Sequence, residues 1–186
     1  MGTAQRCASN ASAAMAAVQK LFMFYIGGDC GNSNIELHDV RFSIGATPEA
    51  CHDDLRYQWW GKPKSLHLDC WGEVVQVDGY DVTISTNAPP PDNPKLFFLN
   101  LGGYAPDMFA ELHENTLIVA PDVQTAKKQA LSKVTGWKQV HRDAGFEVEK
   151  AIDVSLMTSQ RGLHLNLVKA AEEKPFAFTC KYLKLG

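Results

Sequence analysis

Long apolar runs, a basic charge excess and nucleotide-binding glycine motifs are all missing from this chain of 186 residues. No run approaches the roughly 18–20 apolar residues that a membrane-spanning helix needs, so we expect no membrane partner. The net charge of −3 argues against nucleic acid as a partner, because binding through phosphates requires a basic face. Neither a GxGxxG nor a Walker spacing occurs, so the usual signals for nucleotide binding are absent.

Closely spaced cysteine pairs are missing as well. The five cysteines are odd in number and show no CxxC spacing, which argues against both a disulfide framework and a cysteine-ligated zinc site. We therefore expect reduced thiols in a cytoplasmic protein. The 45% hydrophobic and 21% charged residues are typical of a globular chain.

What the chain does contain is a repeat. Leu21–His38 (LFMFYIGGDCGNSNIELH) returns as Leu96–His113 (LFFLNLGGYAPDMFAELH). The glycine pair and the Glu-Leu-His ending recur at a constant offset of 75 positions. The apolar run that opens each copy is typical of a buried strand. The matching order of these features indicates that a structural unit is present twice.

The pattern after each copy predicts an α+β fold, a tandem duplication of a β-β-α-β-β unit. A single unit would have a marginal core, so we expect both to pack into one pseudo-symmetric body. The predicted parts are a leader, disordered or a short helix, at 1–20, a first unit at 21–86, a Pro-rich linker at 87–95 and a second unit with an extra C-terminal strand at 96–186.

Local signals place the helices and turns of these units. Thr47 and Asp122 stand at predicted N-cap positions. The predicted buried helix faces are Cys51, Leu55 and Trp59 in the first unit, and Ala126, Ala130 and Val134 in the second. Asp78-Gly79 predicts a tight hairpin, Ser155–Gly162 a polar loop, and Pro175–Leu185 a last strand that completes a shared sheet.

Three segments together resemble a bacterial family catalogued as domain of unknown function 1543. They are LFMFYIGGDCGNSNIELHDVRFSIG, SLHLDCWGEVVQVDGYDV and LFFLNLGGY. The resemblance covers roughly Leu21 to Val168, and it implies a bacterial cytoplasmic protein. It implies no activity, cofactor or partner.

The glycine pairs are the first of three duplicated polar signatures. Backbone N–H groups beside such a pair at a strand end can bind an anion. Gly27, Gly28, Gly102 and Gly103 are therefore ligand-binding candidates. A turn that needs a positive φ is the simpler alternative.

Glu-x-His is the second signature, at Glu36/His38 and at Glu111/His113. Residues i and i+2 share one face of a strand, so each carboxylate and imidazole point together. Both groups bind divalent metals, and pseudo-twofold symmetry could bring all four into one site. A divalent metal ion is thus the one cofactor that these residues predict. The alternative is a polar strand face with local Glu–His pairing.

His-x-Asp is the third signature, at His67/Asp69, with His141/Asp143 as a weaker counterpart. The same geometry places His67 and Asp69 on one face, and we include both among the ligand-binding candidates. The alternative is a polar face on which Asp69 caps a turn.

Three hypotheses of function follow. The first is a non-catalytic module that binds a small molecule or a protein between its two units. The second is a metal-assisted hydrolase that uses the Glu-x-His pairs. The third is RNA binding by a sheet face beside the lysines between 127 and 138. The sequence names neither a substrate nor an oligomeric state.

Overall fold

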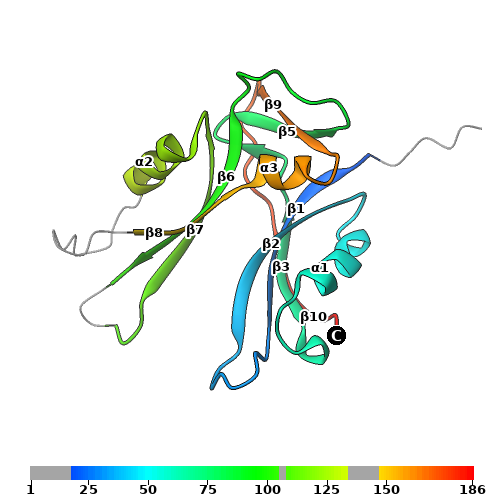
Figure 1. The fold of residues 1–186 in the computed structure, drawn as a ribbon, viewed down its shortest axis with the longest axis vertical. Coiled ribbons are helices and arrows are strands. Elements are labelled where there is room, and N and C mark those ends of the chain that lie inside the picture. The colour runs from blue at the N-terminus through cyan, green and yellow to red at the C-terminus, as the bar shows by residue number, and fades with distance from the viewer. Residues whose placement is uncertain (1–17, 105–107, 134–146) are drawn as a thin grey trace, which may run out of the picture.

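The computed structural model describes residues 18–104, 108–133 and 147–186 (Figure 1). The first half contains β1 (Lys20–Gly28), β2 (Leu37–Gly45), η1 (Glu49–Cys51), α1 (His52–Gln58), η2 (Pro63–Ser65), β3 (His67–Glu73), β4 (Gln76–Val77) and β5 (Tyr80–Ser85). The second half contains β6 (Lys95–Gly103), β7 (Leu112–Ala120), α2 (Val123–Lys133), β8 (Glu147–Asp153), α3 (Val154–Ser159), β9 (His164–Lys169) and β10 (Thr179–Lys184). The mixed α+β composition is confirmed. None of the described helices is long and apolar enough to cross a membrane.

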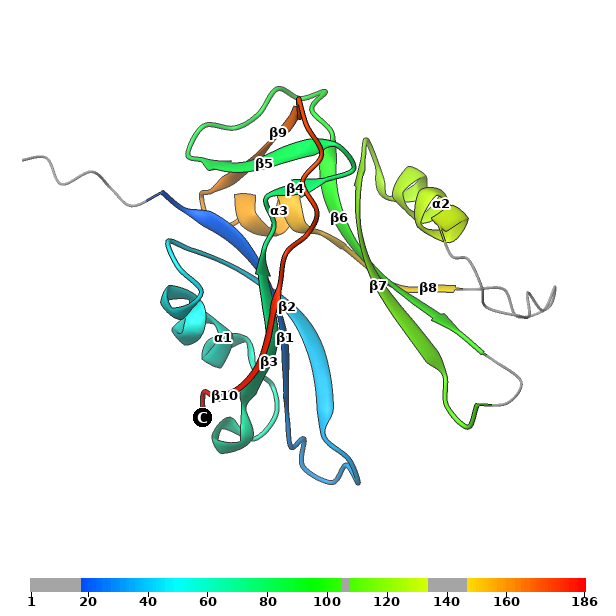
Figure 2. The ribbon, with the colours of Figure 1, turned by 180° about the vertical axis from the view of Figure 1, so that it is seen from behind.

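The described strands form three antiparallel sheets. Their orders are β10-β3-β1-β2, β7-β6-β8 and β4-β5-β9. Figures 1 and 2 show the two outer sheets diverging from the small sheet that joins them. That small sheet links the halves because β5 pairs with β9, from Tyr80 opposite Lys169 to Ser85 opposite His164.

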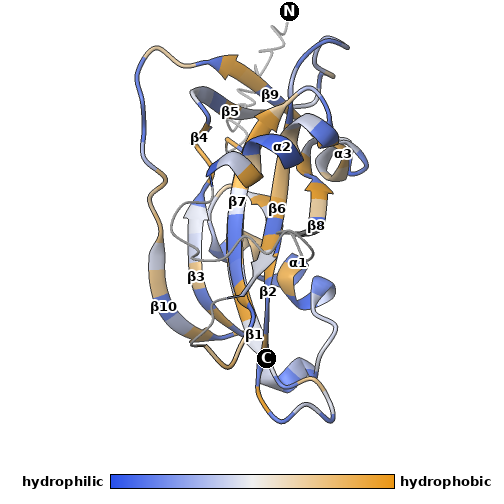
Figure 3. Cartoon of the chain, turned by 90° about the vertical axis from the view of Figure 1, so that its left-hand side faces the viewer, coloured by the Kyte–Doolittle hydropathy of each residue, from blue (hydrophilic) through white to orange (hydrophobic). Residues whose placement is uncertain are grey.

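Each half buries one face of its first strand under a helix. In the first half, Phe22, Phe24 and Ile26 pack against the predicted helix face of Cys51, Leu55 and Trp59. In the second half, Phe97, Leu99 and Leu101 pack against Ala126 and Ala130, while Val134 lies outside the described residues. The exposed side of α2 is hydrophilic, whereas β6 is largely apolar (Figure 3). The residues of the predicted helix faces are therefore buried where they are described, but Trp59 follows the end of α1 as its extended C-cap residue.

A third cluster lies where the two halves meet. It combines Leu21, Val40 and Phe42 of the first half with Leu96, Phe98 and Val119 of the second, together with side chains of β4, β5 and β9. The rings of Phe42 and Phe98 meet edge to face at 5.6 Å, a favourable aromatic geometry. This shared core makes the halves one body.

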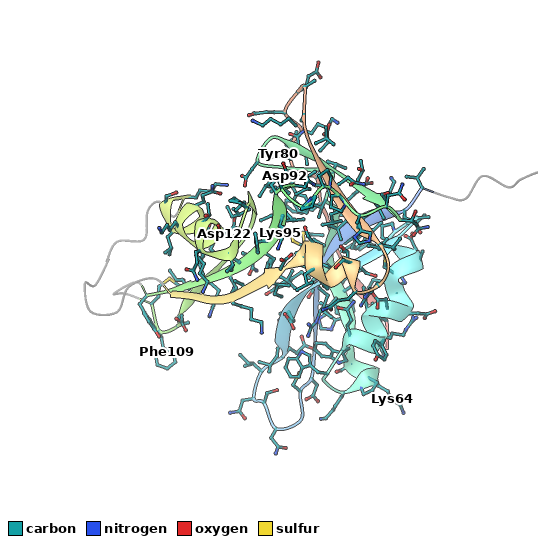
Figure 4. The ribbon with its side chains drawn as sticks, turned by 45° about the horizontal axis from the view of Figure 1, so that its top comes forward. Lys64, Tyr80, Asp92, Lys95, Phe109 and Asp122 are labelled. Atoms are coloured by element: carbon teal, nitrogen blue, oxygen red, sulfur yellow. A yellow bond between two sulfur atoms is a disulfide. The ribbon has the colours of Figure 1, made fainter. Side chains whose placement is uncertain are left out.

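Local capping follows the sequence signals in both halves. Asp122 accepts a 2.8 Å hydrogen bond from the Thr125 N–H at the start of α2 (Figure 4), and Thr47 accepts one of 3.4 Å from the Ala50 N–H. Between β4 and β5, Asp78 and Gly79 have φ values of 50° and 74°, as expected for a type I′ turn.

The predicted polar loop at Ser155–Gly162 is wrong, because most of it is the helix α3. Asp153 caps this helix by accepting a 2.8 Å hydrogen bond from the Leu156 N–H. Val154 and Thr158 are 0% and 1% exposed, so one side of the short helix is buried. Tertiary packing has overridden a weak local signal here.

The expectation of five reduced thiols is also wrong, since Cys70 and Cys180 form a disulfide. The predicted last strand exists as β10, and it returns to the first half to pair with β3. This pairing places Cys180 directly opposite Cys70, with Cα atoms 4.2 Å apart. The two cysteines are 110 positions apart in sequence, so no local spacing revealed them. Cys30 and Cys51 are free thiols, and Cys7 lies outside the described residues.

Asp54 on α1 ties the two halves together at the surface. Its Oδ2 accepts hydrogen bonds from Ser43 (2.6 Å), Gln58 (2.8 Å) and, from the second half, Arg161 (2.7 Å). Burial pushes the pKa of Asp54 upward, but these donors and the Arg161 charge together hold the pKa below its usual 3.8. The stabilising contribution is therefore present above pH 3.8 and is lost as the pH falls through the lowered value.

We expect Asp54→Asn to lower the free energy of unfolding by about 1–2 kcal/mol at pH 7. Urea unfolding at pH 7 and at pH 3 measures this loss. The difference in unfolding free energy between the variant and wild type should be smaller at pH 3. Asp53→Asn is the control, because that side chain is 96% exposed. An equal loss at both pH values would contradict the assignment.

Candidate metal site

The end of β1 lies between the polar ends of two neighbouring strands. Gly27 pairs with His38 on β2 and with His67 on β3. Side chains at directly paired positions point to the same face of a sheet. Both imidazoles therefore lie over Gly27, and the Glu-x-His and His-x-Asp signatures of the first half meet there.

Gly27 provides the space in which these rings meet. A Cβ atom at this position would lie 2.6 Å from Nε2 of His38 and 2.9 Å from Nε2 of His67. Gly27 is not among the described residues with positive φ, so the turn that we considered as an alternative does not explain it. At Gly28 a Cβ would instead lie 2.8 Å from Oγ of Ser65. Both glycines are required by close packing.

Asp69 enters the same site through a β-bulge. The register passes from Tyr25 opposite Cys70 to Ile26 opposite Leu68, which leaves Asp69 as the extra residue of β3. Bulges commonly redirect a side chain. Here the carboxylate comes between the rings, with Oδ2 3.1 Å from Nε2 of His38 and 3.4 Å from Nε2 of His67.

Glu36 completes the group from the residue just before β2. Its Oε2 lies 3.9 Å from Nε2 of His67, and its side chain is 57% exposed. Ligand atoms of Glu36, His38 and His67 all lie within 4.8 Å of one another. We refer to Glu36, His38, His67 and Asp69 as the His–acid cluster.

The hydrogen bonds of the cluster orient its lone pairs inward. His67 is buried, and its Nδ1 lies 3.1 Å from the Ser65 carbonyl oxygen. A carbonyl only accepts, so Nδ1 carries the proton and neutral His67 turns the lone pair of Nε2 toward the carboxylates. Oδ2 of Asp69 is buried and lies within ion-pairing distance of both imidazoles. A proton on Nε2 of His38 or a cation among these atoms would pair this carboxylate oxygen.

The spacing of the ligand atoms matches a small divalent ion. Ligands about 2.0–2.2 Å from a tetrahedral Zn²⁺ lie about 3.3–3.6 Å from each other. The separations in the cluster are 3.1, 3.4 and 3.9 Å. A backbone carbonyl on the second nitrogen of a histidine, as Ser65 provides, is the usual outer partner of a metal ligand.

Two tyrosines hold the imidazoles in place. The ring of Tyr25 stacks on His38 at 5.2 Å, and that of Tyr182, on β10, stacks on His67 at 4.7 Å. Burial, followed by the charges of Asp69 and Asp39, raises the pKa of the Tyr25 phenol. No local pattern indicates that Tyr182 belongs to this site, because only the return of β10 to β3 brings it to the cluster.

The second half places its own signature differently. Gly102 pairs with His113 on β7 and with Glu147 on β8, so a glutamate holds the register position of His67. His113 Nε2 lies 3.8 Å from Oε2 of Glu111. Among the described residues, neither side chain belongs to a group of three or more metal-ligating side chains. The expected convergence of both Glu-x-His pairs is thus not observed, and His141 and Asp143 lie outside the described residues.

A cleft lies between the two halves, beside the His–acid cluster. This cleft of about 530 Å³ is lined from the first half by Tyr25, His38, Asp39, Val40 and Arg41, and from the second by Phe98, Asn100, His113, Asn115, Lys150 and Ile152. We call it the central cleft. It lies between the diverging sheets of Figure 2, with β2 on one side and β7 on the other. Because His38 belongs to both, the central cleft and the His–acid cluster are adjacent.

Comparisons with known proteins agree with the resemblance seen in the sequence. Residues 33–84 match the family described as "Domain of Unknown Function (DUF1543)". Over 90% of its length, the chain is similar to the "Crystal structure of a protein Il1583 from Idiomarina loihiensis", with 29% sequence identity, a TM-score of 0.69 and 98% of that chain covered. A search of curated proteins finds no match. These descriptions name no activity, so a function has to be argued from the site.

Proposed function

We propose that this protein binds one divalent metal ion of the zinc class in the His–acid cluster and presents it at the edge of the central cleft. One observation carries the proposal: three potential ligand atoms converge, because the Nε2 atoms of His38 and His67 lie 3.1 and 3.4 Å from the buried Oδ2 of Asp69. An ion between these atoms satisfies all three at once. Gly27 supports the proposal, because its lack of a side chain leaves the required space.

The ligand types narrow the choice of ion. Two imidazole nitrogens and two carboxylates suit Zn²⁺, Fe²⁺ or Mn²⁺, whereas a Ca²⁺ site would consist of oxygen ligands alone. His38, His67 and Asp69 surround the centre of the cluster, and Glu36 reaches it from the solvent side. This arrangement resembles catalytic zinc sites, in which a fourth position is exchangeable.

A metal-assisted hydrolase is the second candidate, and the exposure of Glu36 favours it. A carboxylate that is 57% exposed and 3.9 Å from a ligand nitrogen can act as a general base instead of a ligand when water takes the fourth position. In this version of the hypothesis, the metal ligands and the general base all come from the first half, as far as the described residues show.

We further propose that the halves arose by duplication, with the leader, units and linker at 1–20, 21–86, 87–95 and 96–186. The strand registers support this: Gly27 faces His38 as Gly102 faces His113. Bulges also follow at corresponding places, between Tyr25 and Ile26 and between Asn100 and Leu101. After such a duplication the halves have diverged at the site, because His67 pairs with Gly27 whereas Glu147 pairs with Gly102.

Metal binding is tested with the full-length chain, stripped with a chelator and titrated with Zn²⁺ or Co²⁺. We expect one tightly bound ion in wild type. His38→Ala should weaken binding by at least about 100-fold, because it removes a ligand, which is worse than the 10–100-fold loss typical of an outer partner. His113→Ala is the matched control at the same register position of the second half. Absence of binding, or an equal loss in both variants, would overturn the proposal.

A further inference from the structure

The geometry points to a small organic carboxylate as the ligand of the central cleft. The volume of the central cleft, about 530 Å³, is within the range of pockets that hold small molecules. This inference deepens the proposed function and rests on it for one contact, that between the ligand and the metal ion. All other contacts of the ligand are with residues that line the cleft.

The charge of the cleft favours an anion. The chain as a whole carries −3, yet the lining residues include Arg41 and Lys150 against a single carboxylate, Asp39. That carboxylate is already engaged: Asp39 Oδ2 lies 2.6 Å from Arg41 Nη2 and accepts a 3.4 Å hydrogen bond from Trp60. Lys150 approaches from the second half, and it has no ion-pair partner among the described residues. A cationic ligand would find no free acid in this lining.

Arg41 carries an unfulfilled donor. Its Nε is buried and has no hydrogen-bond partner, although its Nη2 is paired with Asp39. Because this N–H is buried, it does not face the open cleft, and Arg41 contributes its positive charge at the cleft wall.

The other lining residues suit an organic rather than an inorganic anion. Val40, Phe98 and Ile152 give the cleft an apolar part. Asn100 donates a 2.8 Å hydrogen bond to Asn115, which fixes two amides whose remaining N–H groups are further donors. An apolar surface beside a few convergent donors is the usual lining of a small-molecule site.

His38 connects this cleft with the proposed metal. Its ring lines the central cleft, while its Nε2 belongs to the His–acid cluster. A ligand with a carboxylate at each end would therefore place one near Arg41 and Lys150 and the other toward the ion. A dicarboxylate of four or five carbons is the simplest compound with this chemistry.

The test measures binding of succinate by calorimetry, with succinamide as a neutral probe of the same skeleton. We expect succinate to bind and succinamide to fail. Lys150→Gln should weaken succinate binding about tenfold, the worth of one charged hydrogen bond. Lys128→Gln is the control, because Lys128 is exposed on α2, and it should leave succinate binding unchanged.

Each experiment is repeated with chelator-stripped and Zn²⁺-loaded protein, which separates the two proposals. Succinate binding that survives stripping and still depends on Lys150 would support the cleft even if no metal binds. Succinate binding that requires Zn²⁺ but is unaffected by Lys150→Gln would overturn the proposed cleft ligand and leave the proposed metal site standing. The proposed cleft ligand would also be overturned if neither succinate nor glutarate bound with a dissociation constant below about 10 mM.

Discussion

Replacing Gly27 by alanine is expected to abolish metal binding without unfolding the protein. The new Cβ would lie 2.5 and 2.6 Å from Cδ2 and Nε2 of His38 and 2.9 Å from Nε2 of His67. Contacts this short force the imidazoles apart, because both approach the same point. The ligand atoms would then no longer be within reach of one ion, and we expect affinity at least about 1000-fold lower.

The fold should tolerate this change better than the site does. The obstructing atoms are side-chain atoms, which can move, and alanine is no worse than glycine in a strand interior. His38 is exposed and can swing toward solvent, away from Tyr25. The measurement is Zn²⁺ titration beside circular dichroism and thermal unfolding of the same preparation.

Gly102→Ala is the matched control, because Gly102 pairs with His113 as Gly27 pairs with His38. It places a methyl group at the corresponding point of the second half, where the described residues contain no group of three or more metal-ligating side chains. Zn²⁺ affinity should stay within about twofold of wild type. Wild-type affinity in Gly27→Ala would show that the ion, if any, binds elsewhere.

The sequence predicted the local structure around Gly27 but not why the glycine is needed. An apolar run ending in two glycines identified β1, and i, i+2 spacing placed Glu36 with His38 and His67 with Asp69. What remained hidden was that β2 and β3 both border β1. Strand order is a non-local property, and the sequence suggested symmetry between halves where the structure instead joins two signatures within one half.

Two further features of the site depend on strand pairing that the sequence pattern did not reveal. Asp69 points between the imidazoles because a bulge adds a residue to β3, and a bulge of this kind carries no glycine marker in the sequence. Tyr182 reaches His67 because β10 crosses back to the first half. The repeat itself gave no sign of that crossing, since the last strand has no counterpart after the first unit.

Reduction of the Cys70–Cys180 disulfide is expected to lower the free energy of unfolding by about 2–5 kcal/mol. The bond closes a loop of 110 positions, and long loops gain most from closure because their unfolded chains lose most freedom. Beyond its pairing with β3, β10 buries little surface, since every residue of Thr179–Lys184 is exposed. Just after the strand, Leu185 is buried, donates a 2.9 Å hydrogen bond to the Leu66 carbonyl and accepts one of 2.8 Å from Arg56.

Urea unfolding with and without a thiol reductant measures this effect, with Cys180→Ser as the genetic equivalent. Cys30→Ser is the control, because Cys30 is a free thiol and should leave both the midpoint and its response to reductant unchanged. The same reduction should loosen Tyr182 from His67, since only one residue separates Tyr182 from Cys180 in β10. Amide hydrogen exchange in β10 should then accelerate before the rest of the sheet opens. Identical midpoints in both redox states would mean that strand pairing alone holds β10 against the site.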